Sequence, residues 1–210
     1  MAHGWRRPPR HGAVPDALCT LVLAAGQGSR YRERSDEDKL LAGHTPAPDA
    51  MPILAMTLGA LAGIGDRMLV VTREDNHPLR AWLEREAPAY GAQVLAIRSN
   101  GLGHSLGQAV SSCATRRGWL VALADMPYVR RYTLERLAAA IQPQRLVVPV
   151  HQGQRGHPRG IGADFGALLR VLSGERGAQA LFDSPSVIEI EVDDPGVLQD
   201  VDRPEDRRPG

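Results

Sequence analysis

The chain has 210 residues, enough for one domain with a buried core, and a formal net charge of +1 at pH 7. A near-neutral chain with 4% aromatic residues lacks the basic field and the stacking surfaces of nucleic-acid-binding proteins, so we expect no nucleic-acid partner. No apolar run approaches the ~20 residues of a membrane span, and we expect no membrane association.

The first residues differ in composition from the rest of the chain. Residues 1–16 are rich in Arg, Pro, Gly and His and lack the apolar core of a signal peptide, which predicts a disordered extension or a weak electrostatic tail before a domain over residues 17–206. The two cysteines, Cys19 and Cys113, lack metal-ligand spacing and favour reduced thiols in a cytoplasmic protein.

Apolar segments and helical patterns alternate along the chain. Buried strands are predicted at 17–24, 68–72, 93–97, 119–124 and 146–150. Helices are predicted at 53–64, after the capping residue Asn76, at 106–116 and at 133–140. This order favours a single-domain α/β fold of the Rossmann-like three-layer type, with a mostly parallel sheet covered on both faces.

A glycine-rich loop follows the first strand. Gly26 and Gly28 leave backbone N–H groups accessible, and Arg30 and Lys39 supply positive charge, which together favour binding of a nucleotide's phosphates. The loop is not a Walker A motif, and Tyr31 stands where a dinucleotide fingerprint has its third glycine. The alternative is a simple turn between strand and helix.

Two further polar features follow apolar strands. The loop at 100–105 contains Asn100, Gly101 and Ser105, and Asp125 follows the strand at 119–124. Because ligands bind at the carboxyl ends of strands in open α/β sheets, we expect these features to meet the glycine-rich loop at one edge. A carboxylate there could bind Mg²⁺; the alternative is a cap on the following turn.

Acidic residues near the C-terminus provide candidate partners for Asp125. Asp200 or Asp202 could complete the metal site, although a solvated turn is an alternative interpretation of this segment. Asp193 and Asp194 are predicted to lie in a surface loop.

A polar, glycine-rich segment contains Gly156, His157 and Pro158. It could line the pocket of an acceptor substrate; the alternative is an exposed histidine in a loop.

Six segments in order carry a family resemblance, at 23–30 with 39–41, 100–106, 123–127, 156–158, 174–178 and 200–206. Together they resemble the MobA-like nucleotidyltransferases and are most similar to the molybdenum cofactor cytidylyltransferases. The resemblance covers nearly all of residues 19–206 and implies a fold like that of nucleotide-diphospho-sugar transferases. This chain departs from the family pattern by about four extra residues before Lys39 and by an apparent insertion at 45–50.

The resemblance also implies residue roles. Those of nucleotide binding fall on Leu23, Ala24, Ala25, Gly26, Gly28, Arg30, Lys39, Asn100, Gly101 and Ser105. Arg30, Lys39 and Asp125 would be catalytic, with Mg²⁺ held by Asp125 and either Asp200 or Asp202. Gly156, His157 and Pro158 would bind the acceptor.

The implied reaction is Mg²⁺-dependent transfer of CMP from CTP to the phosphate of molybdopterin, with release of pyrophosphate. Alternatives are another nucleotide such as GTP, a sugar 1-phosphate acceptor, or a non-catalytic maturation factor that binds the cofactor. A molybdenum hydroxylase or its maturation factor is the implied protein partner.

Overall fold

The computed structural model describes residues 17–98, 101–174, 177–184 and 186–208. The predicted extension at 1–16 and the candidate residue Asn100 lie outside the described residues. No helix in the described part of the chain is both long and apolar enough to span a membrane.

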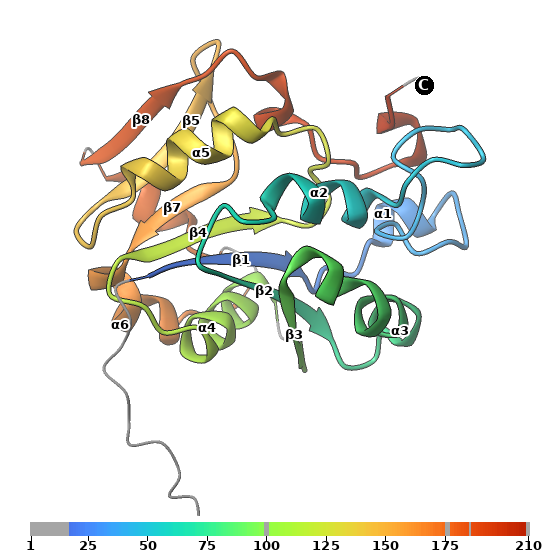
Figure 1. Ribbon diagram of the computed structural model, residues 1–210, viewed down its shortest axis with the longest axis horizontal. Coiled ribbons are helices and arrows are strands. Elements are labelled where there is room, and N and C mark those ends of the chain that lie inside the picture. The colour runs from blue at the N-terminus through green and yellow to red at the C-terminus, as the bar shows by residue number, and fades with distance from the viewer. Residues whose placement is uncertain (1–16, 99–100, 175–176, 185, 209–210) are drawn as a thin grey trace, which may run out of the picture.

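One mixed sheet forms the centre of the fold (Figure 1). Its strands lie in the order β3-β2-β1-β4-β7-β5-β6, with β8 paired to β5. Their bounds are β1 Leu18–Ala24, β2 Arg67–Arg73, β3 Ala92–Ile97, β4 Gly118–Leu123, β5 Leu146–His151, β6 Gln154–Arg155, β7 Arg159–Gly162 and β8 Val187–Glu191. The pairs β1–β2, β1–β4, β2–β3 and β5–β8 are parallel, as the mostly parallel prediction requires.

Helices cover both faces of this sheet, which confirms the three-layer prediction. Their bounds are α1 Ser29–Arg32, α2 Ile53–Leu61, α3 His77–Glu86, α4 Leu102–Ser112, α5 Arg131–Ala140 and α6 Gly166–Arg170. Apolar side chains of α2, α3 and α5 belong to one core cluster, and those of α4 and α6 to a second cluster on the opposite face. All seven residues of β1 are therefore buried, which explains its unbroken apolar sequence.

Parallel register brings three strand ends to one edge of the sheet. Ala24 in β1 pairs with Thr72 in β2, and Leu23 pairs with Leu123 in β4. The loops after β1, β2 and β4 therefore leave the sheet side by side.

The antiparallel part of the sheet was not predicted from the sequence. β7 lies between β4 and β5 and is antiparallel to both. It is short and contains Gly160 and Gly162, where an added Cβ atom would come within 2.6 Å and 2.1 Å of neighbouring atoms. These glycines allow close packing, so β7 lacks the apolar run by which other strands are predicted.

Two predicted features near α4 and the C-terminus are wrong in position. The helix predicted at 106–116 is α4, which begins four residues earlier, because Gly103 lies against the backbone of Ser173 and so belongs to a packed helix rather than a loop. Asp194, predicted in a surface loop, is fully buried and accepts hydrogen bonds from the Arg130 amide and the Thr133 hydroxyl.

The expectation of reduced cysteines is also wrong. Cys19 at the start of β1 and Cys113 at the end of α4 form a disulfide across 94 residues of sequence. Both side chains lie in the core cluster under α4. The packing of α4 on β1 brings them together, and their spacing in the sequence does not predict this. The cysteines therefore give no support to a cytoplasmic location.

Candidate nucleotide-binding site

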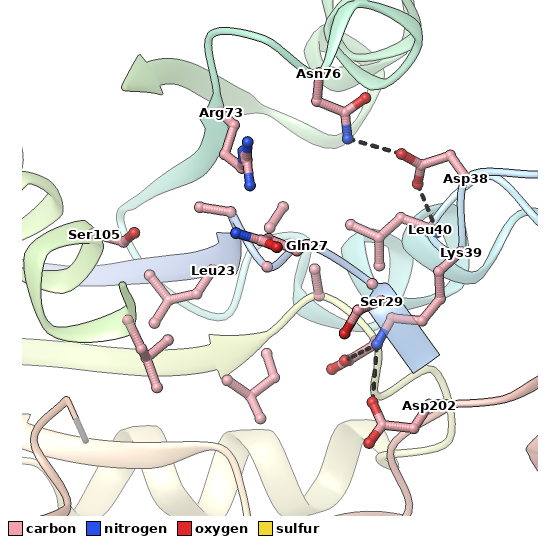
Figure 2. Close-up of a pocket in the computed structure, with 18 of the residues that line it drawn as sticks. Leu23, Gln27, Ser29, Asp38, Lys39, Leu40, Arg73, Asn76, Ser105 and Asp202 are labelled. Carbon is pink, nitrogen blue, oxygen red and sulfur yellow. Dashed lines mark hydrogen bonds and ion pairs between the residues drawn. The ribbon is translucent and has the colours of Figure 1, made fainter. Parts of the chain in front are cut away.

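A cavity of ≈ 680 Å³ opens at the sheet edge where β1, β2 and β4 end. Its lining comes from the loops after these strands, from the start of α4 and from the C-terminal segment (Figure 2). The lining residues that the sequence analysis selected are Leu23, Ala24, Ala25, Gly26, Gly28, Arg30, Lys39, Gly101, Ser105, Asp125 and Asp202. Three loops distant in sequence therefore share one cavity, as predicted from their positions at the carboxyl ends of parallel strands.

The loop after β1 turns into the short helix α1. Gly28 has φ 61°, a left-handed conformation that favours glycine, and its carbonyl accepts hydrogen bonds from the amides of Tyr31 and Arg32. Tyr31 is buried and fixes the turn to the core, which explains why no third glycine stands there. A Cβ atom on Gly26 would meet no protein atom within 4 Å outside Gly26 and its two chain neighbours, so the space above this glycine is open to a ligand.

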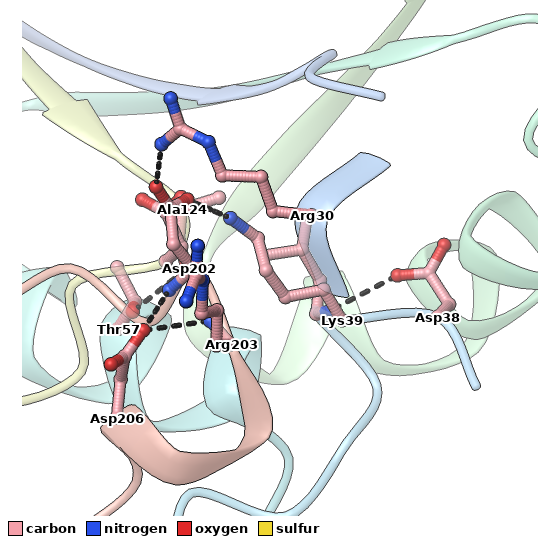
Figure 3. A network of polar contacts seen from close by, with 10 residues as sticks. Arg30, Asp38, Lys39, Thr57, Ala124, Asp202, Arg203 and Asp206 are labelled. Atoms are coloured by element: carbon pink, nitrogen blue, oxygen red, sulfur yellow. Dashed lines mark hydrogen bonds and ion pairs between the residues drawn. The ribbon is translucent and has the colours of Figure 1, made fainter. Parts of the chain in front are cut away.

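Four charged side chains meet beside this loop (Figure 3). Lys39 Nζ lies 2.6 Å from Asp125 Oδ2 and 3.2 Å from Asp202 Oδ1, and Arg30 Nη1 lies 2.5 Å from Asp202 Oδ2. The Lys39 side chain is 12% exposed and that of Arg30 is 66% exposed. Lys39 and Asp125, 86 residues apart, thus occupy the same cluster, which we call the cation–carboxylate cluster (Arg30, Lys39, Asp125 and Asp202).

Burial and ion pairing act against each other on these groups. Burial alone would lower the pKa of Lys39, but Asp125 and Asp202 outweigh it and hold the pKa above the ordinary value. Burial alone would raise the pKa of Asp202, but Lys39 and Arg30 hold it below the ordinary value. The lysine is therefore a cation and Asp202 an anion at neutral pH.

The C-terminal segment is tied to the end of β4. The Val201 amide donates a hydrogen bond of 2.9 Å to the Asp125 carbonyl, and the amides of Asp202 and Arg203 donate to Asp206 Oδ2. These bonds fix the backbone that carries Asp202 next to Asp125, while Arg203, Glu205 and Asp206 of the same turn are exposed to solvent.

The loop that carries Lys39 is anchored on its other side to α3. Asp38 accepts hydrogen bonds from the Leu40 amide and from Asn76 Nδ2, at 2.9 Å and 2.7 Å. Asn76 Oδ1 in turn accepts from the Leu79 amide and caps α3, as predicted. These contacts hold Lys39 at the cavity despite the long insertion before it.

The residues present fit a divalent cation at Asp125. Its Oδ1 atom is buried and has no hydrogen-bond partner, while Oδ2 pairs with Lys39. An unpartnered buried carboxylate oxygen beside a second carboxylate, Asp202, is a donor set that hard cations such as Mg²⁺ accept. No cluster of three or more His, Cys, Asp or Glu side chains suited to a metal occurs within the described part of the chain.

Asp200 stands apart from this pair. It is exposed and is not among the cavity's lining residues. Partial burial of its carboxyl group, followed by the charges of Asp202 and Asp125, raises its pKa, although the residue as a whole is exposed. Of the two candidates for the second carboxylate, Asp202 is the one that the structure brings into the cavity.

The predicted acceptor residues lie beside the cavity rather than in its lining. They precede β7, which pairs antiparallel with β4 from Val121 opposite Arg159, and Pro158 lines a second, smaller pocket with Leu123, which also lines the cavity. The His157 amide donates to the Val197 carbonyl at 2.9 Å. Burial, with a smaller effect of Arg159, lowers the pKa of His157 to about 4, so its imidazole is neutral at pH 7.

Asp38, Arg73 and Asn76 are among the polar residues that line the cavity and were not predicted from the sequence as site residues. Arg73 is the last residue of β2. Because ligands bind at the carboxyl ends of the strands, the reasoning used for β1 and β4 also identifies Arg73 when it is applied to β2. Ser105, expected in a loop, lies instead in α4 and lines the cavity from that helix.

A mixed, mostly parallel sheet between helices, with a glycine loop, cations and carboxylates at one edge, defines a nucleotidyltransferase-like protein. Residues 20–189 match the MobA-like NTP transferase domain, and the chain belongs to this family.

The chain is also similar to particular proteins. It is 30% identical over 156 residues to the bifunctional protein GlmU of Syntrophotalea carbinolica. The matched region covers 74% of this chain and 31% of that protein. The chain thus spans about a third of the length of this curated relative.

Solved structures share the fold. Rv0371c from Mycobacterium tuberculosis H37Rv superposes with a TM-score of 0.74 and 24% identity, covering 90% of this chain and 95% of that one. Rv0371c has also been solved in complex with manganese, with a TM-score of 0.63 and 22% identity over 84% of this chain and 88% of that one. A nucleotidyl transferase from Methanothermobacter thermautotroptrophicus has a TM-score of 0.72 and 22% identity over 91% of this chain and 94% of that one.

Proposed function

We propose that the protein transfers CMP from CTP to the phosphate of molybdopterin and releases pyrophosphate. The observation that carries the proposal is the cation–carboxylate cluster, in which Lys39 lies within 3.2 Å of both Asp125 and Asp202 beside an open glycine loop. Family membership supports a nucleoside triphosphate as substrate, and the order of motifs from 123–127 to 156–158 supports the cytidylyl branch.

The reaction needs positioning and charge neutralisation more than covalent chemistry. An oxygen of the acceptor phosphate attacks the α-phosphorus of CTP in line; a P–O bond to the acceptor forms and the bond to the β-phosphate breaks. Arg30 and Lys39 would neutralise the departing pyrophosphate. No general base is required, because the acceptor phosphate is already ionised at neutral pH.

Asp125 and Asp202 would hold the divalent cation, and the manganese complex of Rv0371c supports such an ion. When bound, the ion supplies positive charge that polarises phosphoryl oxygens. The neutral imidazole of His157 and its neighbours Gly156 and Pro158 would orient the acceptor from the segment that precedes β7, the strand beside β4. The product would pass to a molybdenum hydroxylase or its maturation factor in the cytoplasm.

Pyrophosphate release from CTP in the presence of molybdopterin tests the proposal. Asp125→Ala is expected to abolish release, whereas Arg34→Ala, which removes an exposed ion pair with Glu205 outside the cavity lining, should leave it unchanged. Full turnover by Asp125→Ala would overturn the role of this carboxylate. Binding of CTP without turnover by the wild type would instead favour the non-catalytic alternative.

Other substrates of the same class are separated by binding. A thermal-shift panel of CTP, GTP, UTP and ATP, each with and without Mg²⁺, ranks the nucleotides, because a ligand that binds only the folded protein raises its melting temperature. Replacing molybdopterin by a sugar 1-phosphate in the pyrophosphate assay tests the alternative acceptor.

A further inference from the structure

Arg73 lines the same cavity as the cation–carboxylate cluster but is drawn away from Lys39 and Asp202 in Figure 2. It is the last residue of β2, the strand next to β1, and it lines the cavity with 26% of its side chain exposed. In Figure 2 its side chain extends from β2 toward Gln27, with Ser105 on the same side of the glycine loop, while Lys39 and Asp202 lie on the other side.

Asp75 fixes the orientation of the Arg73 guanidinium. Arg73 Nε donates to Asp75 Oδ1 at 2.8 Å, and Nη2 donates to Asp75 Oδ2. This pair uses one edge of the guanidinium. Nη1 and the remaining N–H of Nη2 form a second edge, and no described residue accepts a hydrogen bond from Nη1. A rigid donor pair therefore remains available to a ligand.

The position of the phosphates determines which part of a bound nucleotide lies next to the donor pair of Arg73. The proposed function puts the β and γ phosphates against Arg30 and Lys39, and the present inference rests on that function. A nucleotide that extends along the cavity from that end then has its base near Arg73 and Ser105.

We propose that Arg73 is a specificity-determining residue that selects cytosine or guanine over uracil and adenine. Two parallel N–H donors match two adjacent acceptors, as arginine matches O6 and N7 of guanine. Cytosine offers N3 and O2 as such a pair. Uracil alternates acceptor, donor and acceptor on the corresponding edge, and adenine presents a donor beside N7, so neither base accepts both bonds.

Titration calorimetry with the four nucleoside triphosphates and with inorganic tripolyphosphate tests this assignment in the full chain. The wild type is expected to bind CTP or GTP about 5- to 150-fold more tightly than UTP and ATP. Arg73→Ala should remove this preference and leave tripolyphosphate binding unchanged. Arg73→Lys keeps the charge but not the paired donors, and it should lose the preference to the same extent.

Arg98→Ala is the matched control, since Arg98 is 91% exposed, pairs with Glu74 and does not line the cavity. An equal loss of affinity for all four nucleotides and for tripolyphosphate in Arg73→Ala would make Arg73 a phosphate ligand and overturn the inference. An unchanged preference in Arg73→Ala, or a wild type that prefers UTP or ATP, would also overturn it. A wild type that binds no nucleoside triphosphate would instead refute the proposed function itself.

Discussion

Replacing Lys39 by methionine isolates the contribution of its ion pairs to stability. The side chains of Lys39, Asp125 and Asp202 are 12%, 20% and 33% exposed, so the cluster lies between a surface and a buried ion pair. Exposed pairs contribute about 0.2–1 kcal/mol, whereas removing one partner of a buried pair costs about 3–5 kcal/mol. Because Arg30 still neutralises Asp202, we expect Lys39→Met to lower the free energy of unfolding by about 2 kcal/mol.

Urea denaturation at pH 7 measures this change, and the melting temperature should fall by about 4–8 °C for a chain of this size. The difference should depend on pH with a defined sign. The pKa of Asp202 in the folded protein is held low, so its stabilisation is present above the unfolded-state pKa of about 4 and is lost as the pH falls through the folded-state value. The gap between wild type and Lys39→Met should therefore close below about pH 4.

Arg34→Met is the matched control, because Arg34 and Glu205 form an ion pair between the same two segments with both side chains about half exposed. Its unfolding free energy should change by less than about 1 kcal/mol. If Lys39→Met stays within about 0.5 kcal/mol of the wild type at pH 7, or if the gap persists unchanged at pH 3, the cluster does not stabilise the free protein as reasoned.

Three further changes probe other parts of the fold. As the pH falls from about 6.5 to about 4, the wild type should lose up to about 3 kcal/mol of unfolding free energy relative to His157→Gln. The reason is that the buried imidazole takes up a proton only on unfolding. Parallel pH profiles of the two proteins would contradict this. Asp194→Ala should cost about 3–5 kcal/mol in chemical denaturation, and exposed Asp193→Ala less than about 0.5 kcal/mol; similar values for both would contradict the buried role. Cys113→Ser should lower the free energy of unfolding by about 4 kcal/mol, because it removes the disulfide with Cys19. Dithiothreitol should destabilise the wild type but not this variant. A wild-type melting temperature that does not respond to the reductant would argue against the disulfide.

The central half of the sheet and much of the candidate site follow from simple sequence rules. Buried parallel strands are apolar without alternation, so β1, β2 and β4 were predicted within two residues of their bounds. Because their carboxyl ends must meet at one edge, Gly26 and Asp125 could be placed together before any coordinates were known.

The rest depends on long-range packing that local patterns do not encode. β7 is a strand because it fits between β4 and β5, and its glycines give no periodic signal. Asp194 has the composition of a loop residue, yet hydrogen bonds from the start of α5 fix it in the interior. The start of α4 was misplaced because Gly103 marks close contact between backbones, which is indistinguishable in sequence from a loop glycine.

Lys39 occupies the carboxylate oxygens that a divalent cation would need, and this predicts a competition. In Lys39→Met, Asp125 and Asp202 lose a shared cation, so Mg²⁺ alone should stabilise this variant more than the wild type. At a Mg²⁺ concentration about ten times the dissociation constant the gain is about 1.4 kcal/mol, or about 3–6 °C in melting temperature. Adding Asp125→Asn to Lys39→Met should abolish the shift, because the unpartnered Oδ1 is then part of an amide. Equal Mg²⁺ shifts in the wild type and Lys39→Met would mean that the lysine and the ion do not share these oxygens.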